Sequence, residues 1–119
     1  MKAYIIILTL LVHPISSFGQ NKDYYLRQAD SYQRETECYS KQAERYQRDA
    51  EYYTRQADKY LTEANYSAQK GDISIAKTSQ GWASEAMDRA KISQNWAIEA
   101  SRKAATRMQW ASDALKKAR

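Results

Sequence analysis

The side chains that could do chemistry are few. The chain has one Cys, Cys38, one His, His13, and only three Gly among its 119 residues. A single imidazole and a single thiol supply neither the ligand set of a structural zinc site nor a conventional catalytic triad. Three Gly are also too few to suggest a phosphate-cradling loop. We therefore expect no enzymatic activity, no metal site and no cofactor.

Two positions are candidates for covalent modification. Cys38 is a lone thiol, which in an oxidising compartment favours a disulfide between two chains or a reactive free thiol. The alternative is that Cys38 is an incidental half-buried residue. Asn65 begins an Asn-Tyr-Ser glycosylation sequon, which has meaning only in a eukaryotic host.

The start of the chain has the composition of a secretory signal peptide. Lys2 supplies the positive charge, residues 3–12 are apolar, and Ser17-Phe18-Gly19 resembles a cleavage pattern of small residues. The apolar stretch is too short for a membrane span, which needs roughly 20 residues. We expect residues 1–19 to be a signal peptide, and the protein to be extracellular, or periplasmic in a bacterium, with no membrane span.

A seven-residue spacing organises the first half of the remaining chain. Tyr recurs at every seventh position from Tyr25 to Tyr60, and Ala or Thr follows each of these Tyr by four residues. Alternating spacings of four and three are the core pattern of a heptad coiled coil, so we predict one helix over about 23–69. Its expected contact positions include Tyr32, Tyr46, Tyr60, Ala43, Ala50 and Ala57.

A related repeat organises the second half. Trp82, Trp96 and Trp110 are spaced by 14 residues, and Ala recurs at every seventh position from Ala76 to Ala118. The same reasoning predicts a second helix over about 73–118. Its expected contact positions include Trp82, Trp96, Trp110, Ala83, Ala90 and Ala97.

Lys70-Gly71-Asp72 lies between the two repeats, whose Ala rows are out of register. Gly71 can adopt the positive φ that ends a helix, and Asp72 can cap the next one. We therefore predict a turn at 70–72 that makes the two helices antiparallel. Residues equidistant from Gly71 then face each other, which pairs Tyr60 with Trp82, Tyr46 with Trp96 and Tyr32 with Trp110.

The expected fold is thus all-α: an antiparallel helical hairpin, or coiled coil, over residues 20–119, with an Ala-rich seam and rows of Tyr and Trp. Two alternatives remain open. One is a single helix, kinked at Gly71, that pairs only with other chains. The other is a four-helix bundle made of two hairpins.

The formal net charge of +5 comes mainly from the second helix. Its last part is basic and is the candidate for contact with an anionic polysaccharide, a mineral or another anionic surface. The candidate residues are Arg102, Lys103, Arg107, Lys116 and Lys117. Cations at this end of a helix also complement its dipole, so we expect no specific binding of nucleic acid.

These features favour a structural role over a catalytic one. We expect a secreted coiled-coil protein that associates with copies of itself as a unit of an extracellular matrix, a secreted fibre or a surface layer. The alternative is an extracellular or periplasmic adaptor that docks its basic second helix on an anionic partner.

Overall fold

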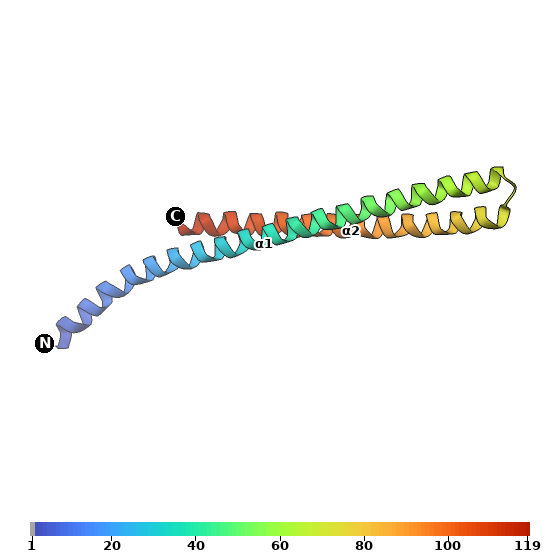
Figure 1. Cartoon of the computed structure of the whole chain (residues 1–119). Coiled ribbons are helices and arrows are strands. Elements are labelled where there is room, and N and C mark those ends of the chain that lie inside the picture. The colour runs from blue at the N-terminus through green and yellow to red at the C-terminus, as the bar shows by residue number, and fades with distance from the viewer. Residues whose placement is uncertain (1) are drawn as a thin grey trace. The chain divides into compact units, whose positions relative to one another are not determined.

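A computed structural model describes the backbone of residues 2–119 and the side chains of residues 21–119. It contains two helices, α1 (Lys2–Gln69) and α2 (Ile73–Ala118), which confirms the all-α class (Figure 1). Helix α1 begins at Lys2 and not near residue 23, so the segment assigned to a signal peptide is continuous with the helix in this chain. Its removal stays a prediction.

The chain divides into two compact units. One comprises Tyr39–Lys103, in which α1 and α2 run antiparallel on either side of the turn (Figure 1). The other comprises Met1–Cys38 together with Ala104–Arg119 and contains the last part of α2 beside an earlier part of α1.

The turn at 70–72 is formed by hydrogen bonds that match the residue types there. Gly71 has a φ of 83°, and its N–H donates to the carbonyl of Ala68 over 3.0 Å. The N–H of Asp72 donates to the carbonyl of Ser67 over 2.9 Å, and this pair of bonds is the Schellman ending of a helix. The carboxylate of Asp72 accepts the N–H of Ile75 over 3.3 Å and so caps α2.

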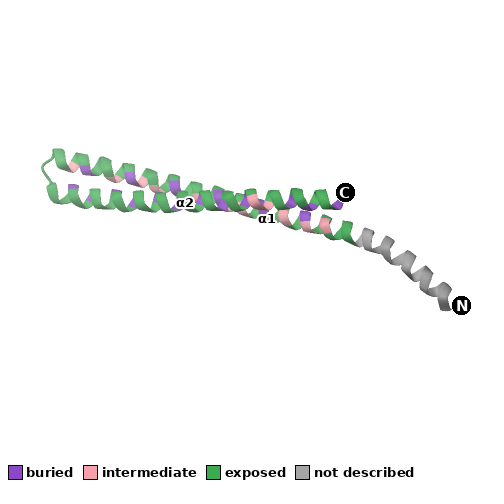
Figure 2. Cartoon of the chain, turned by 180° about the vertical axis from the view of Figure 1, so that it is seen from behind, coloured by how far each residue is buried: buried purple, intermediate pink, exposed green. Residues whose placement is uncertain are grey.

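The two helices meet through small side chains. In the described residues, the buried apolar side chains are all Ala, and no large side chain is fully buried. Figure 2 shows the buried positions as a stripe along the sides of α1 and α2 that face each other. Small residues allow two helix axes to approach closely, and they leave no room for larger side chains between them.

Replacing a buried Ala by Leu should therefore destabilise the fold. Ala104 is 7% exposed, whereas the neighbouring Ala105 is exposed, so Ala104→Leu and Ala105→Leu form a matched pair. We expect Ala104→Leu to lower the free energy of unfolding by about 1–3 kcal/mol because the seam is overpacked. Ala105→Leu should change it by less than about 0.5 kcal/mol. Thermal unfolding followed by circular dichroism measures both, and equal effects would show that the Ala seam is not tightly packed.

Candidate functional site: the aromatic face

One side of each helix pair carries aromatic rings, and we call it the aromatic face. It consists of the Tyr at every seventh position of α1, from Tyr25 to Tyr60, and of Trp82, Trp96 and Trp110 on α2. In the Tyr39–Lys103 unit, the ring centroids lie 5.5 Å apart for Tyr60 and Trp82 and 5.4 Å apart for Tyr46 and Trp96. In the other unit, Tyr32 and Trp110 are 5.5 Å apart.

The rings of Tyr46–Trp96 and Tyr32–Trp110 meet edge to face, and those of Tyr60–Trp82 are tilted by 59°. Edge-to-face contacts are favourable because the positive edge of one ring meets the negative face of the other. These Tyr–Trp pairs are the ones predicted from equal distance along the sequence from Gly71. The Tyr are half-buried, but Trp82, Trp96 and Trp110 are 50%, 52% and 43% exposed. The Trp therefore border the seam, and each remains partly exposed to solvent.

The Ala named as contact positions lie in the seam itself. All six are buried, at 1–6% exposure: Ala43, Ala50, Ala57, Ala83, Ala90 and Ala97. The same row on α1 contains Thr36, and the second row of α2 contains Ser79 and Ser93, and these three are buried as well. The contact is thus built from side chains no larger than Thr.

Cations lie on the Tyr that have no Trp partner. Arg89 sits 5.8 Å from the ring centroid of Tyr53, and Lys103 lies 5.7 Å from that of Tyr39. Lys117 lies 5.7 Å from the ring centroid of Tyr25. A cation over the face of an aromatic ring is attracted by the ring's quadrupole.

The basic residues proposed for anion contact are therefore largely engaged within the chain. Lys103 and Lys117 lie on Tyr rings, and Arg107 contacts both Trp110 and Glu35. Arg102 also has an interaction partner, while Lys116 is exposed near the end of α2. The structure does not bring the five residues together as one open basic patch.

The aromatic face contains three hollows that repeat the same chemistry. Each is bordered by a Tyr and a Gln of α1 and by a Trp, a carboxylate, an Ala and a cation of α2. Their volumes are 280, 220 and 320 Å³. The shared residues are Gln56, Tyr60, Trp82, Glu85, Ala86 and Arg89; Gln42, Tyr46, Trp96, Glu99, Ala100 and Lys103; and Gln28, Tyr32, Trp110, Asp113, Ala114 and Lys117.

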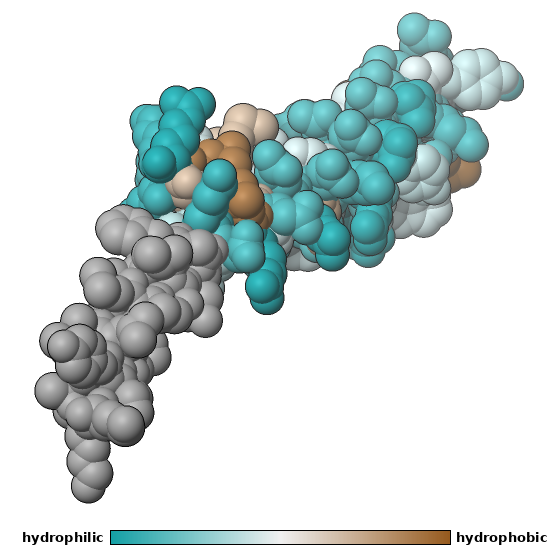
Figure 3. All heavy atoms as spheres, turned by 90° about the vertical axis from the view of Figure 1, so that its left-hand side faces the viewer, coloured by the Kyte–Doolittle hydropathy of each residue, from teal (hydrophilic) through white to brown (hydrophobic). Residues whose placement is uncertain are grey.

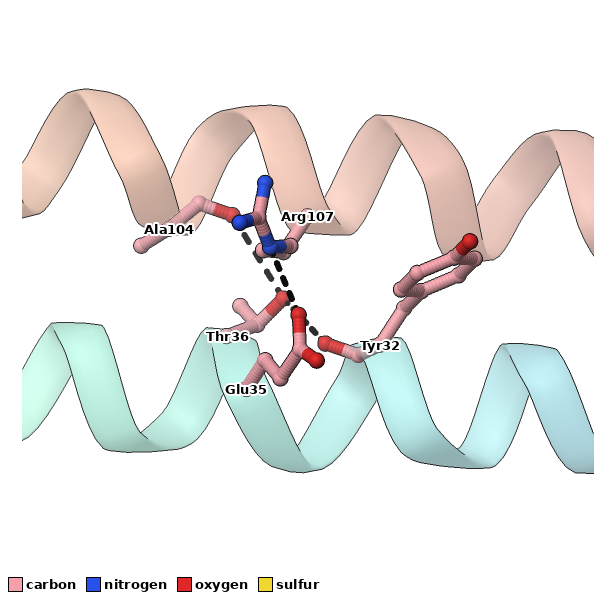
Figure 4. Close-up of polar contacts among 5 residues, drawn as sticks. All are labelled: Tyr32, Glu35, Thr36, Ala104 and Arg107. Atoms are coloured by element: carbon pink, nitrogen blue, oxygen red, sulfur yellow. Dashed lines mark hydrogen bonds and ion pairs between the residues drawn. The ribbon is translucent and has the colours of Figure 1, made fainter.

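A polar contact between the helices interrupts this regular pattern (Figure 4). Arg107 donates from Nε to a carboxylate oxygen of Glu35 over 2.6 Å, and its guanidinium lies 4.2 Å from the Trp110 ring centroid. The hydroxyl of Thr36 lies 2.8 Å from the carbonyl oxygen of Tyr32 and 3.4 Å from that of Ala104. Because it has one proton, it shares that proton between the two acceptors.

Sequence reasoning missed the Gln row, the carboxylate row and the Glu35–Arg107 pair. The 14-residue period that revealed the Trp also contains Gln28, Gln42 and Gln56 and the acids Glu85, Glu99 and Asp113. That period would have identified both rows. A break in the repeat indicates the ion pair: Arg107 occupies the position at which the two earlier repeats have Ser79 and Ser93.

The two candidates for covalent modification are both exposed on α1. Cys38 is a free thiol with an exposed side chain, on α1 at the end of one unit. Asn65 is exposed on α1, close to the turn. Among the residues whose side chains are described, no three His, Cys, Asp or Glu gather as a metal site would require. No helix in that part of the chain is long and apolar enough to cross a membrane.

Comparison with known proteins gives no relative: the chain matches no family model, no curated protein and no solved structure.

The Glu35–Arg107 pair should contribute measurably to stability. Its side chains are 45% and 23% exposed, whereas the Asp30–Arg34 pair on α1 is 60% and 79% exposed. A double-mutant cycle with Glu35→Gln and Arg107→Gln should give a coupling energy of about 0.5–1 kcal/mol. The Asp30→Asn and Arg34→Gln cycle is the control and should give about 0.3–0.5 kcal/mol. A larger coupling for the exposed control pair would contradict the structural role of the ion pair.

Proposed function

We propose that this protein is a secreted structural coiled-coil protein that associates with copies of itself as a unit of an extracellular matrix, fibre or surface layer. The observation that supports this proposal is the contrast between a core of Ala, Ser and Thr and many large apolar side chains outside it. Exposed apolar side chains that form a contiguous patch mark a surface that contacts another molecule.

The core alone gives limited stability. Each Ala buries one methyl group, and burial of a methylene-sized group is worth about 0.8 kcal/mol. The larger apolar side chains add little to this within one chain, since Ile98, Met108 and Trp96 are all more than half exposed. Association with a second copy would bury Ile98 and Met108 and stabilise the helices, which derive most of their stability from packing of an apolar face.

Self-association requires a surface other than the Ala seam, because the seam is used within the chain. The side opposite the aromatic face has an apolar groove in each unit, and we call it the groove face. In the Tyr39–Lys103 unit the groove has a volume of 660 Å³ and is bordered by Gln47, Thr54, Ala97 and Ile98. In the other unit it has a volume of 380 Å³ and is bordered by Met108, Ala111 and Leu115.

Further aliphatic side chains continue the groove face by helical spacing. Leu61 follows Thr54 by seven residues, and Met87 precedes Gln94 by seven; both Leu61 and Met87 are exposed. Seen from the end at which α2 finishes, the surface shows a small apolar patch surrounded by hydrophilic side chains (Figure 3). Leu26, Met108 and Leu115 are the exposed aliphatic side chains of the described residues in that unit.

A second copy of this chain fits the charges on the groove face. Glu51 and Arg55 both border the larger groove. A two-fold contact brings the same surface of each copy together, so a face with both signs of charge offers attractive pairs and avoids repulsion. The adaptor alternative has less support, because Lys103, Arg107 and Lys117 contact groups of their own chain.

If the groove face joins two copies, Ile98→Gln should weaken self-association. Ile98 borders the larger groove and is 57% exposed. Burial of such a side chain is worth about 1.5–3 kcal/mol, so we expect the dissociation constant to rise by about tenfold or more. Sedimentation velocity over a range of protein concentrations measures this change.

Ile92→Gln is the matched control, because Ile92 is 49% exposed and does not border the groove. It should leave the sedimentation profile unchanged. Circular dichroism on the same samples shows whether each variant keeps its helices. A helical wild-type chain that stays monomeric at all concentrations would refute the proposal, as would equal effects of the two variants.

Cys38 offers an independent test of contact between copies. Its thiol is exposed and unpaired, so an oxidising compartment favours a disulfide with the same residue of another chain. We expect air oxidation to give a covalent dimer on a non-reducing gel, and Cys38→Ser or a reducing agent to abolish it. A chain that remains a covalent monomer after oxidation would exclude this cross-link.

A further inference from the structure

We propose that the aromatic face binds a neutral, linear polysaccharide built of equatorially linked pyranose units. The proposal goes beyond the structural role and does not depend on it, since self-association uses the opposite side of the helices. It rests on the three hollows that repeat one set of six residue types at 14-residue intervals.

The groups in each hollow suit a sugar unit. A half-exposed Trp ring offers an apolar surface for the flat C–H face of a pyranose, and pockets that bind small molecules combine such surfaces with a few polar groups. In the hollow at Trp96, the polar groups are Gln42, Glu99, Lys103 and the hydroxyl of Tyr46. The amide and the Tyr hydroxyl donate and accept hydrogen bonds, the carboxylate accepts them, and the ammonium group donates them, as sugar hydroxyls require.

The charge of the hollows favours a neutral ligand. Each contains one carboxylate and one cation, so its formal charge sums to zero. The cation is also already engaged, because Arg89, Lys103 and Lys117 lie on Tyr rings of the same chain. An anionic sugar placed in the hollow would meet the carboxylate without gaining an unoccupied cation.

The repetition favours a linear polymer over a single small molecule. Trp82 and Trp96 lie on α2 in the same unit, and 14 residues of helix rise by about 21 Å. A ligand with a repeating unit can occupy both hollows at once, and the second contact then forms at a high effective concentration. A monosaccharide gains nothing from the repetition.

The three Trp are not equally accessible, which makes the proposal testable. The Arg107 guanidinium lies over the Trp110 ring, 4.2 Å from its centroid. The corresponding positions before Trp82 and Trp96 are Ser79 and Ser93, whose side chains are too short to cover a ring. Arg107 thus lies on the Trp110 ring, although Trp110 is still 43% exposed and Arg107 does not border the hollow beside it. We therefore assign the stronger sugar contacts to Trp82 and Trp96, where the shorter Ser79 and Ser93 take the place of Arg107.

The test is affinity electrophoresis of the purified chain in native gels that contain a soluble cellulose derivative. Hydroxyethylcellulose is neutral, whereas carboxymethylcellulose has the same backbone with negative charges. We expect retardation by hydroxyethylcellulose and weaker retardation by carboxymethylcellulose. Tryptophan fluorescence titrated with cello-oligosaccharides should show affinity that rises steeply once the oligosaccharide is long enough to span about 21 Å of helix.

Substitution of single Trp should identify the contacts. We expect Trp96→Ala to weaken binding by about two- to tenfold, as loss of one aromatic contact does. Trp110→Ala removes a ring of the same kind from an equivalent hollow and should change the affinity by less than Trp96→Ala. Equal losses for the two variants would overturn the assignment.

Arg107→Ser should increase binding, a result that misfolding cannot produce. It introduces the residue that the repeat has at 79 and 93 and uncovers the Trp110 ring. Glu35→Gln is the control, because it breaks the same ion pair but leaves Arg107 on the ring. We expect about a two- to tenfold gain for Arg107→Ser and no gain for Glu35→Gln.

Three outcomes would overturn the proposal. The first is no retardation by either polymer, and the second is stronger retardation by carboxymethylcellulose, which would indicate an anionic partner. The third is loss of self-association in Trp96→Ala, measured by sedimentation, which would assign the aromatic face to a second copy of the chain. Failure of the groove face to associate leaves this proposal unaffected, since that result concerns Ile98 on the opposite side.

Discussion

The close approach of two helices through small side chains is the constraint from which the other features of this structure follow. The seam contains Ala, Ser and Thr, and a larger side chain between the helices would force them apart. Large residues must therefore lie beside the seam. This displacement produces one face with Tyr and Trp and an opposite face with grooves and exposed aliphatic side chains.

The aromatic face shows how a repeat becomes a set of equivalent sites. Both helices have a 14-residue period, and an antiparallel arrangement about Gly71 keeps these periods in step. Tyr residues therefore meet Trp and basic residues alternately, as in Tyr46 with Trp96 and Tyr39 with Lys103. The same matched periods place a Gln of α1 and a carboxylate of α2 beside every Tyr–Trp pair. The three hollows are thus a direct result of the register between the two repeats.

The contact of Glu35, Thr36 and Arg107 departs from the 14-residue repeat. A regular repeat by itself does not fix the register in which two helices pair. A helix pair with identical 14-residue units could pair in more than one register with similar apolar contacts. A polar residue at a core position favours the register in which its partner is present. Glu35 binds Arg107 through side chains, so this contact exists only in the register that brings the two residues together. The departure also places the Arg107 guanidinium on the Trp110 ring, which distinguishes Trp110 from Trp82 and Trp96.

The sequence by itself determined the helices, the turn and the pairing of Tyr with Trp. Heptad spacing depends on the 3.6-residue helical turn, and Gly71 with Asp72 requires only local hydrogen bonds, so both can be read from residue order. The same equal distance from Gly71 puts Lys103 level with Tyr39, Lys117 level with Tyr25 and Arg107 level with Glu35. Two things were decided only by tertiary structure. The Trp lie at the border of the seam, half exposed, and Lys103, Lys117 and Arg107 are engaged within the chain and do not form an open basic patch. Each depends on how closely and at what rotation the helices meet, because burial and contact across the seam are properties of the pair, whereas periodicity is a property of each helix alone.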